Sequence, residues 1–197
     1  MKIYEYRGVY GLVAAEVTKD DADEITFGTP FDVAGVSRLS RETDSSSETH
    51  YYNNSPAIVV QGISADTVTI DASAIPLDVL AKLTGQTYDD TLGVFIEGAP
   101  QSKYFAIGYQ TKDTDGNEVY VWRLKGSFAI PGEEHSTIDN GTGANGQQLV
   151  YTGIETIHKF TKTGNPAKAV NVELAKDLAK VDTFFDAVQT PDTIVAK

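Results

Sequence analysis

Apolar and polar residues alternate over much of this chain, a pattern typical of β-strands that bury one face. Within residues 9–18, for example, Val9, Val13 and Val17 fall on the same face of an extended strand. The pattern predicts a mainly β protein, an antiparallel β-sandwich or barrel of about seven to nine strands. The expected strands are residues 9–18, 25–30, 31–36, 57–70, 91–96, 104–110, 118–128 and 149–160.

The clearest strand pair lies in the middle of the chain. An Asp-Gly turn within residues 113–117 joins the strands 104–110 and 118–128, and Asp-Gly is a common connection in β-hairpins. Because side chains alternate along a strand, the second strand should separate its apolar and charged residues onto opposite faces. The expected core face carries Tyr120, Trp122, Leu124 and Phe128, and the other face carries Arg123 and Lys125.

Two segments have helical spacing instead. Residues 75–83 predict one short flanking helix, in which Pro76 suits the first turn and Gly85 suits the left-handed position after the last turn. Residues 172–188 repeat apolar side chains at intervals of four and three, which predicts a C-terminal helical tail. The expected division is a β-sandwich domain over residues 1–160 and a linker with a helical extension over residues 161–197.

Residues 37–56 interrupt the strand pattern, because they are rich in Ser, Asp and Asn and nearly free of aliphatic residues. A segment of this length without a core pattern is either flexible or ordered by a partner, so we expect an extended irregular loop. Tyr51 and Tyr52 near its end either start the next strand or contact a partner, since amphipathic aromatic residues are favoured at interfaces.

The composition suits an acidic β protein. The chain has ten Tyr and eight Phe among its 197 residues, and aromatic residues favour strands. Its net charge is −12, so a direct grip on DNA phosphates is not expected, because that affinity comes from Lys and Arg. Residues 1–100 carry 6 Lys and Arg against 16 Asp and Glu, whereas residues 101–197 carry 10 against 12. This asymmetry suits a molecule with distinct faces, although acidity also keeps an ordinary protein soluble.

The sequence offers no signal for export or membrane insertion. With no cysteine, the chain cannot form disulfides or thiolate metal sites. Polar and aromatic residues follow Met1, in place of the apolar stretch of a signal peptide, and no run approaches the ~18 apolar residues of a membrane helix. We expect the protein to be made and folded in the cytoplasm.

No group of residues predicts catalysis, a metal site or a cofactor site. His50, His135 and His158 are far apart and lack the paired spacing of zinc ligands. The acidic residues 20–24 lack the twelve-position ligand pattern of a calcium loop. The two glutamates before His135 would alternate between strand faces and not converge with it on a substrate. The sequence therefore predicts that the protein is not an enzyme.

Several segments, taken in order along the chain, resemble the major tail protein (tail tube protein) family of bacteriophages with long non-contractile tails. The most distinctive are Tyr104-Phe-Ala-Ile-Gly-Tyr109 and Tyr120-Val-Trp122. The others are residues 17–21, 25–30, 47–56, 75–85, 125–128 and 131–137. The chain departs from the family pattern at Tyr52, where a small residue is usual, at His135, where an aromatic one is common, and in a longer glycine-rich loop at 139–147.

The resemblance implies a structural virion protein, a subunit of the phage tail. Its hexameric rings would stack around a central channel through which the genome is ejected into the host. The implied partners are copies of itself and the tape measure, distal tail and tail terminator proteins, with DNA passing through the lumen without specific binding. The loop at residues 37–56 would then lie between subunits.

Candidate site residues follow from the resemblance and from charge. An acidic lumen would let DNA slide, because like charges repel. The candidates for this lining are Asp20, Asp21, Asp23, Glu24 and Asp66. The candidates for contacts between rings or subunits are Arg38, Arg41, Tyr51 and Tyr52.

Two other interpretations stay open at this point. The first is a soluble β-sandwich binding module, for carbohydrate or a receptor, that decorates a virion; it would be a monomer with an exposed aromatic platform. The second is a related ring protein of a contractile injection machine, and the sequence alone distinguishes it poorly from a tail tube protein of a non-contractile phage. The sequence also leaves open whether residues 161–197 pack on their own subunit or on a neighbour.

Overall fold

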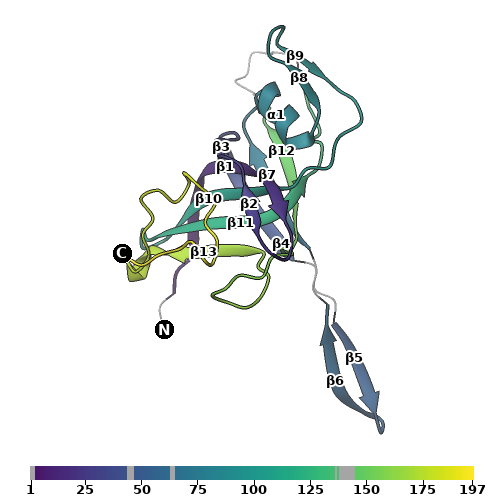
Figure 1. Ribbon diagram of the computed structural model, residues 1–197, viewed down its shortest axis with the longest axis vertical. Helices are drawn as coiled ribbons and strands as arrows, with labels where there is room; N and C mark the ends of the chain where they lie inside the picture. The colour runs from purple at the N-terminus through teal and green to yellow at the C-terminus, as the bar shows by residue number, and fades with distance from the viewer. Residues whose placement is uncertain (1–2, 44–46, 63–64, 136, 138–144) are drawn as a thin grey trace.

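The protein is built around one antiparallel sheet, which the computed structural model describes over residues 3–43, 47–62, 65–135, 137 and 145–197 (Figure 1). The strand order is β2-β1-β10-β11-β12-β7-β4, with β3 beside β1 and β13 beside β11. The strands are β1 Tyr6–Asp20, β2 Ile25–Phe27, β3 Phe31–Asp32, β4 Val36–Thr43, β7 Asp66–Ala72, β10 Phe105–Asp113, β11 Glu118–Phe128, β12 Gln147–Gly153 and β13 Ala169–Glu173. The predicted mainly β, antiparallel fold is confirmed.

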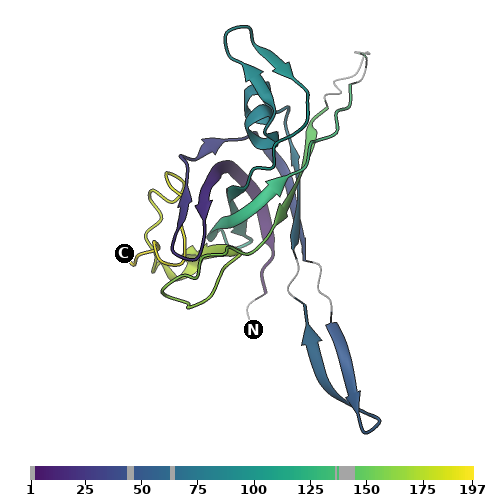
Figure 2. The same ribbon diagram turned by 45° about the vertical axis from the view of Figure 1, so that its right-hand side comes forward.

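Two smaller units lie at opposite ends of the long axis (Figures 1 and 2). At one end, β5 Ser47–Tyr52 and β6 Ser55–Gln61 form a two-stranded hairpin that stands away from the body, here called the projecting hairpin. At the other end, α1 Leu77–Thr84 lies beside the hairpin of β8 Thr87–Asp89 and β9 Val94–Ile96. We call α1, β8 and β9 the helix lobe.

The predicted flanking helix is confirmed, with the ends that the sequence indicated. Pro76 precedes the first turn of α1, and Gly85 follows the last with a φ of 67°. A side chain at Gly85 would also place its Cβ 2.3 Å from the backbone oxygen of Gln101. Only glycine satisfies both the left-handed backbone and this close approach.

The main sheet divides at β11 and folds into two layers. The first part of β11 pairs with β13, through Val119 to Arg123, whereas its last residues, Gly126 to Phe128, pair with β12. The layer of β12, β7 and β4 turns over the layer of β1, β10 and β11, so that β4 contacts β1. An apolar core therefore fills the space between the layers.

Both faces of the central strands are buried, so these strands lack the regular alternation of apolar and polar residues that is expected of a half-buried sheet. The core between the layers includes Phe105, Ile107 and Tyr151, with Leu83 from α1. A second core covers the outer face of β1, β10 and β11; it includes Trp122, Leu124, Phe160, Phe184 and Val188.

The predicted core face of β11 needs one correction. Trp122 and Leu124 share the second core as expected, but Phe128 packs with Phe105 and Tyr151 in the first. The cause is a register shift against β10, where β11 carries one extra residue between Arg123 and Gly126. A bulge of this kind moves every later side chain to the other face.

The predicted C-terminal helix over residues 172–188 is wrong. This stretch begins as β13, makes one 3₁₀ turn at Leu174–Lys176 and continues in turns. The indole Nε1 of Trp122 donates a hydrogen bond to the carbonyl of Phe184 at 2.9 Å, which fixes the segment on the sheet of its own subunit. Leu178, part of the predicted apolar stripe, is 67% exposed. The domain division at residue 160 stays a prediction.

The irregular loop predicted over residues 37–56 is also wrong where the chain is described. β4 pairs with β7 along its length, and β5 turns into β6 through Asn53 and Asn54, whose φ angles are 52° and 61°. Two left-handed residues are what a type I′ hairpin turn requires. Residues 44–46 and 138–144, the latter most of the predicted glycine-rich loop, lie outside the described residues.

Several strand bounds also differ from expectation. The predicted strand 57–70 is divided between β6 and β7, and the predicted strand 149–160 ends at Gly153. The sequence analysis did not predict β8 as a strand.

Candidate functional site

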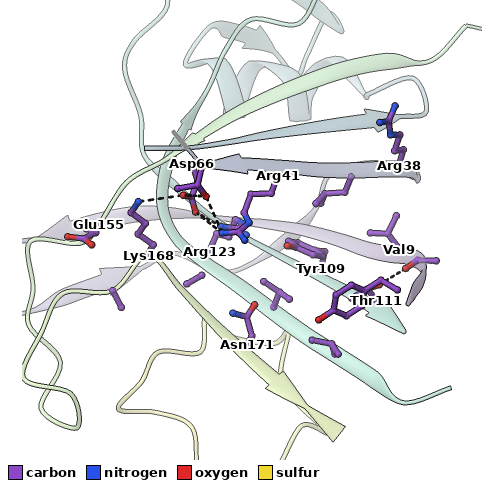
Figure 3. Close-up of a pocket in the computed structure, with 18 of the residues that line it drawn as sticks. Val9, Arg38, Arg41, Asp66, Tyr109, Thr111, Arg123, Glu155, Lys168 and Asn171 are labelled. Atoms are coloured by element: carbon purple, nitrogen blue, oxygen red, sulfur yellow. Dashed lines mark hydrogen bonds and ion pairs between the residues drawn. The ribbon is translucent and has the colours of Figure 1, made fainter. Parts of the chain in front are cut away.

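A cleft of about 1040 Å³ opens between β4 on one side and β10, β11 and β13 on the other (Figure 3). Val9 and Tyr109 line its apolar end. At the other end, Arg41, Arg123 and Lys168 surround the carboxylate of Asp66. This end lies where β4 ends and β7 begins, at the base of the projecting hairpin.

Asp66 pairs with three cations from separate parts of the chain, namely β4, β11 and the residue before β13. Its Oδ2 lies 2.9 Å from Nη1 of Arg123 and 3.6 Å from Nη1 of Arg41, and its Oδ1 lies 3.5 Å from Nζ of Lys168. The hydroxyl of Thr43 donates a further hydrogen bond at 2.9 Å. Burial alone would raise the pKa of Asp66, but the Thr43 hydrogen bond and the three cations lower it below its ordinary value.

The cleft carries an excess of positive charge although the protein as a whole is acidic. Arg38 and Glu155 also line it, so four cations face two carboxylates. Arg123 is 5% exposed, and among the described residues its Nε has no hydrogen-bond partner. A cation buried this deeply depends on Asp66 for its stability, because an unpaired buried charge is costly.

A second buried ion pair ties the end of β1 to β11, and backbone hydrogen bonds to its carboxylate tie both to the chain after β12. Asp20 lies 2.6 Å from Nζ of Lys125, and it accepts the backbone N–H groups of Ile157 and His158 at 2.9 and 3.0 Å. Burial would raise the pKa of Asp20, but these hydrogen bonds and the Lys125 charge lower it. Lys125 also lies 4.9 Å from the ring centre of Tyr104.

The five candidate lumen residues therefore fall into two groups. The side chains of Asp20 and Asp66 are each 4% exposed and paired inside the subunit. Asp23 and Glu24 are exposed in the turn between β1 and β2. Asp21, in the same turn, accepts backbone hydrogen bonds from Asp23 and Glu24 that lower its pKa. The sequence did not indicate these pairs, because Lys125 is 105 residues from Asp20 and Arg123 is 57 residues from Asp66.

The four candidate contact residues occupy two places. Arg38 and Arg41 lie on β4 and line the cleft. Tyr51 and Tyr52 lie at the tip of the projecting hairpin and are 66% and 60% exposed. The sequence analysis missed the exposed apolar run on β6, which is Ile58, Val59 and Val60. These β-branched residues next to an Asn-Asn pair were a hairpin signal.

The helix lobe has exposed apolar residues of its own, namely Leu77, Leu92, Val94, Ile96 and the neighbouring Ile130. Among the described residues, no three His, Asp or Glu side chains are grouped so as to hold a metal ion. In the same part of the chain, no helix has the length and apolar character needed to cross a bilayer.

Comparison with known families gives one finding. The family model described as phage tail tube protein matches residues 41–188. The match takes in the end of β4, the projecting hairpin, the helix lobe and strands β7, β10, β11, β12 and β13, whereas β1, β2 and β3 precede it. A search of curated proteins finds no match.

Proposed function

The chain belongs to the phage tail tube protein family, and on this premise we propose that it is the major tail subunit, whose hexameric rings stack into the tube that carries phage DNA into the host. Family membership makes it a structural protein of the virion that assembles with itself and with other tail proteins. The proposed further partners are the tape measure, distal tail and tail terminator proteins. Its proposed site of synthesis is the host cytoplasm.

The projecting hairpin is the observation that supports self-assembly. An isolated two-stranded hairpin is marginally stable in water. This one has apolar side chains on both faces, because Val59 points to the face opposite that of Ile58 and Val60. Val59 is 60% exposed, and Ile58 and Val60 are each 50% exposed. A hairpin of this kind is stabilised when each face is covered, as it would be between neighbouring subunits.

The acidic lumen is proposed for the turn between β1 and β2 alone. Asp23 and Glu24 are exposed there beside Asp21, and Lys19 forms ion pairs with Asp21 and Glu24 at 3.1 and 2.6 Å. The turn therefore keeps a net negative charge. Such a surface repels DNA phosphates and lets the duplex slide.

Negative-stain electron microscopy with light scattering tests the proposal. The wild-type protein at high concentration is expected to form hollow tubes or stacked rings. Ile58→Thr/Val60→Thr keeps β-branched residues but removes apolar surface, so it should stay monomeric with an unchanged unfolding midpoint. The control Ile157→Thr/Leu178→Thr changes two exposed aliphatic residues of the body, which are 57% and 67% exposed, and should assemble normally.

Two results would contradict different parts of the proposal. Assembly of the hairpin variant at the wild-type threshold would show that the hairpin does not contribute to self-association, although the tube function would stand. A monodisperse wild-type monomer under every condition, even with tail initiation proteins added, would instead favour a binding module on a virion.

A further inference from the structure

Two groups of exposed apolar side chains lie at opposite ends of this molecule, and the two groups differ. One end is the projecting hairpin, and the other is the helix lobe (Figure 1). A two-fold axis brings the same surface of two copies together, so a dimer formed through one end would leave the other end of each copy uncovered. The two unlike surfaces match a head-to-tail contact, which repeats along a line instead of closing.

A groove in the helix lobe has the chemistry to receive aromatic rings. Its volume is about 450 Å³, and Leu80 and Phe95 contribute apolar surface to its lining. The carboxylates of Glu97 and Glu133 line the same groove, and both residues are exposed. An apolar floor with acceptor groups at the rim suits a side chain that is apolar along its body and a hydrogen-bond donor at its tip.

The tip of the projecting hairpin offers such side chains. Tyr51 and Tyr52 are the two residues of β5 next to its turn, and both are largely exposed. A tyrosine ring buries a large apolar area while its hydroxyl donates a hydrogen bond, and a bond to a carboxylate is stronger than one to a neutral group.

The rim of the groove is acidic, because Glu97 and Glu133 line it. A tyrosine hydroxyl can donate a hydrogen bond to such a carboxylate, whereas a purely apolar side chain cannot. The chemistry of the rim therefore favours Tyr51 and Tyr52 over the aliphatic residues of the hairpin as its occupants.

We propose that the groove of the helix lobe is the docking site for the hairpin tip of a second copy, with Tyr51 and Tyr52 against Leu80 and Phe95 and their hydroxyls on Glu97 and Glu133. This rests on the proposed function and adds the receptor surface for the hairpin. It also gives the assembly a direction, with every hairpin pointing the same way.

Cysteine cross-linking tests the docking directly, because the chain has no cysteine of its own. Tyr52→Cys/Glu97→Cys puts one thiol on each surface, so oxidation of assembled material should give a ladder of covalent oligomers on a non-reducing gel. Tyr52→Cys/Glu24→Cys has the same hairpin thiol and an exposed acidic position outside the lobe, and it should give no ladder. Tubes without a ladder in the first variant, or equal ladders in both, would overturn the docking while leaving the tube function intact.

A second measurement avoids the new thiols. Glu97→Gln/Glu133→Gln removes the charged acceptors, and it should raise the concentration needed for assembly about ten-fold or more. Asp71→Asn, an acidic residue on β7 outside the groove, should leave the threshold unchanged. Equal thresholds for wild type and the double variant would contradict the proposal. A wild-type protein that never assembles would overturn both this docking and the tube function.

Discussion

Replacing Asp66 by Asn should destabilise the subunit by about 3–5 kcal/mol, because it breaks a buried ion pair from one side. The carboxylate is the shared partner of Arg41, Arg123 and Lys168, and Arg123 is 5% exposed. The amide of Asn keeps the size and one acceptor but removes the charge. Arg123 would then be a buried cation without a counter-ion.

Urea unfolding followed by tryptophan fluorescence measures this loss. Trp122 is the single tryptophan and is fully buried, so its emission reports on the folded core. The control is Asp71→Asn on the same strand, where the carboxylate only accepts a hydrogen bond from Gln148 on the surface. An Asp66→Asn variant that loses no more free energy of unfolding than Asp71→Asn would refute the reasoning.

The difference in stability between wild type and Asp66→Asn should depend on pH, and the pKa of Asp66 gives the sign of that dependence. The pKa of Asp66 is lowered from its ordinary value of 3.8, so its stabilisation is fully present above that value and is lost as the pH falls through the lowered pKa. The stability difference between wild type and Asp66→Asn should therefore be constant near neutral pH and shrink below about pH 4. A difference that grows on acidification would show that the charged carboxylate is not the stabilising group.

Two further substitutions test how other parts of the fold are held. Trp122→Phe removes the hydrogen bond to the Phe184 carbonyl and leaves a cavity, so it should lower the free energy of unfolding by about 2–4 kcal/mol. It should also make the C-terminal segment more sensitive to limited proteolysis, and equal proteolysis rates for the variant and the wild type would contradict this. Gly85→Ala should lower the free energy of unfolding by about 1–3 kcal/mol more than Gly116→Ala, as measured by thermal unfolding. Both glycines have a positive φ, but only Gly85 lacks room for a Cβ. Equal losses of stability in the two variants would show that the clash at Gly85 is absent.

The sequence predicted those elements whose local pattern and tertiary environment agree. The β10–β11 hairpin and α1 have strong local signals, namely an Asp-Gly turn and paired helix-end residues, and both were predicted. The prediction for residues 172–188 failed because tertiary contacts outweigh the helical spacing. The first two residues pair with β11 as the end of β13, and the later apolar residues Phe184 and Val188 pack on the second core from turns.

The candidate site was only partly accessible from sequence, for a different reason. Arg41, Asp66, Arg123 and Lys168 come from four parts of the chain, and no spacing rule links them. A charged residue within a strand was assigned to a solvent face, because a single sequence does not reveal its counter-ion. The hairpin was missed because its first strand is polar, although the Asn-Asn turn marks it.

The pairing of β1 sets the order in which this protein can fold during synthesis. Tyr6 lies opposite Asp113, so the main sheet cannot close until more than half of the chain has left the ribosome, whereas the projecting hairpin pairs within 15 residues or so. Each growing chain therefore exposes the apolar side chains of this hairpin before its main sheet can close. The first 100 residues carry 16 acidic against 6 basic side chains. Like charge on these segments opposes association between unfinished chains while the main sheet is still incomplete.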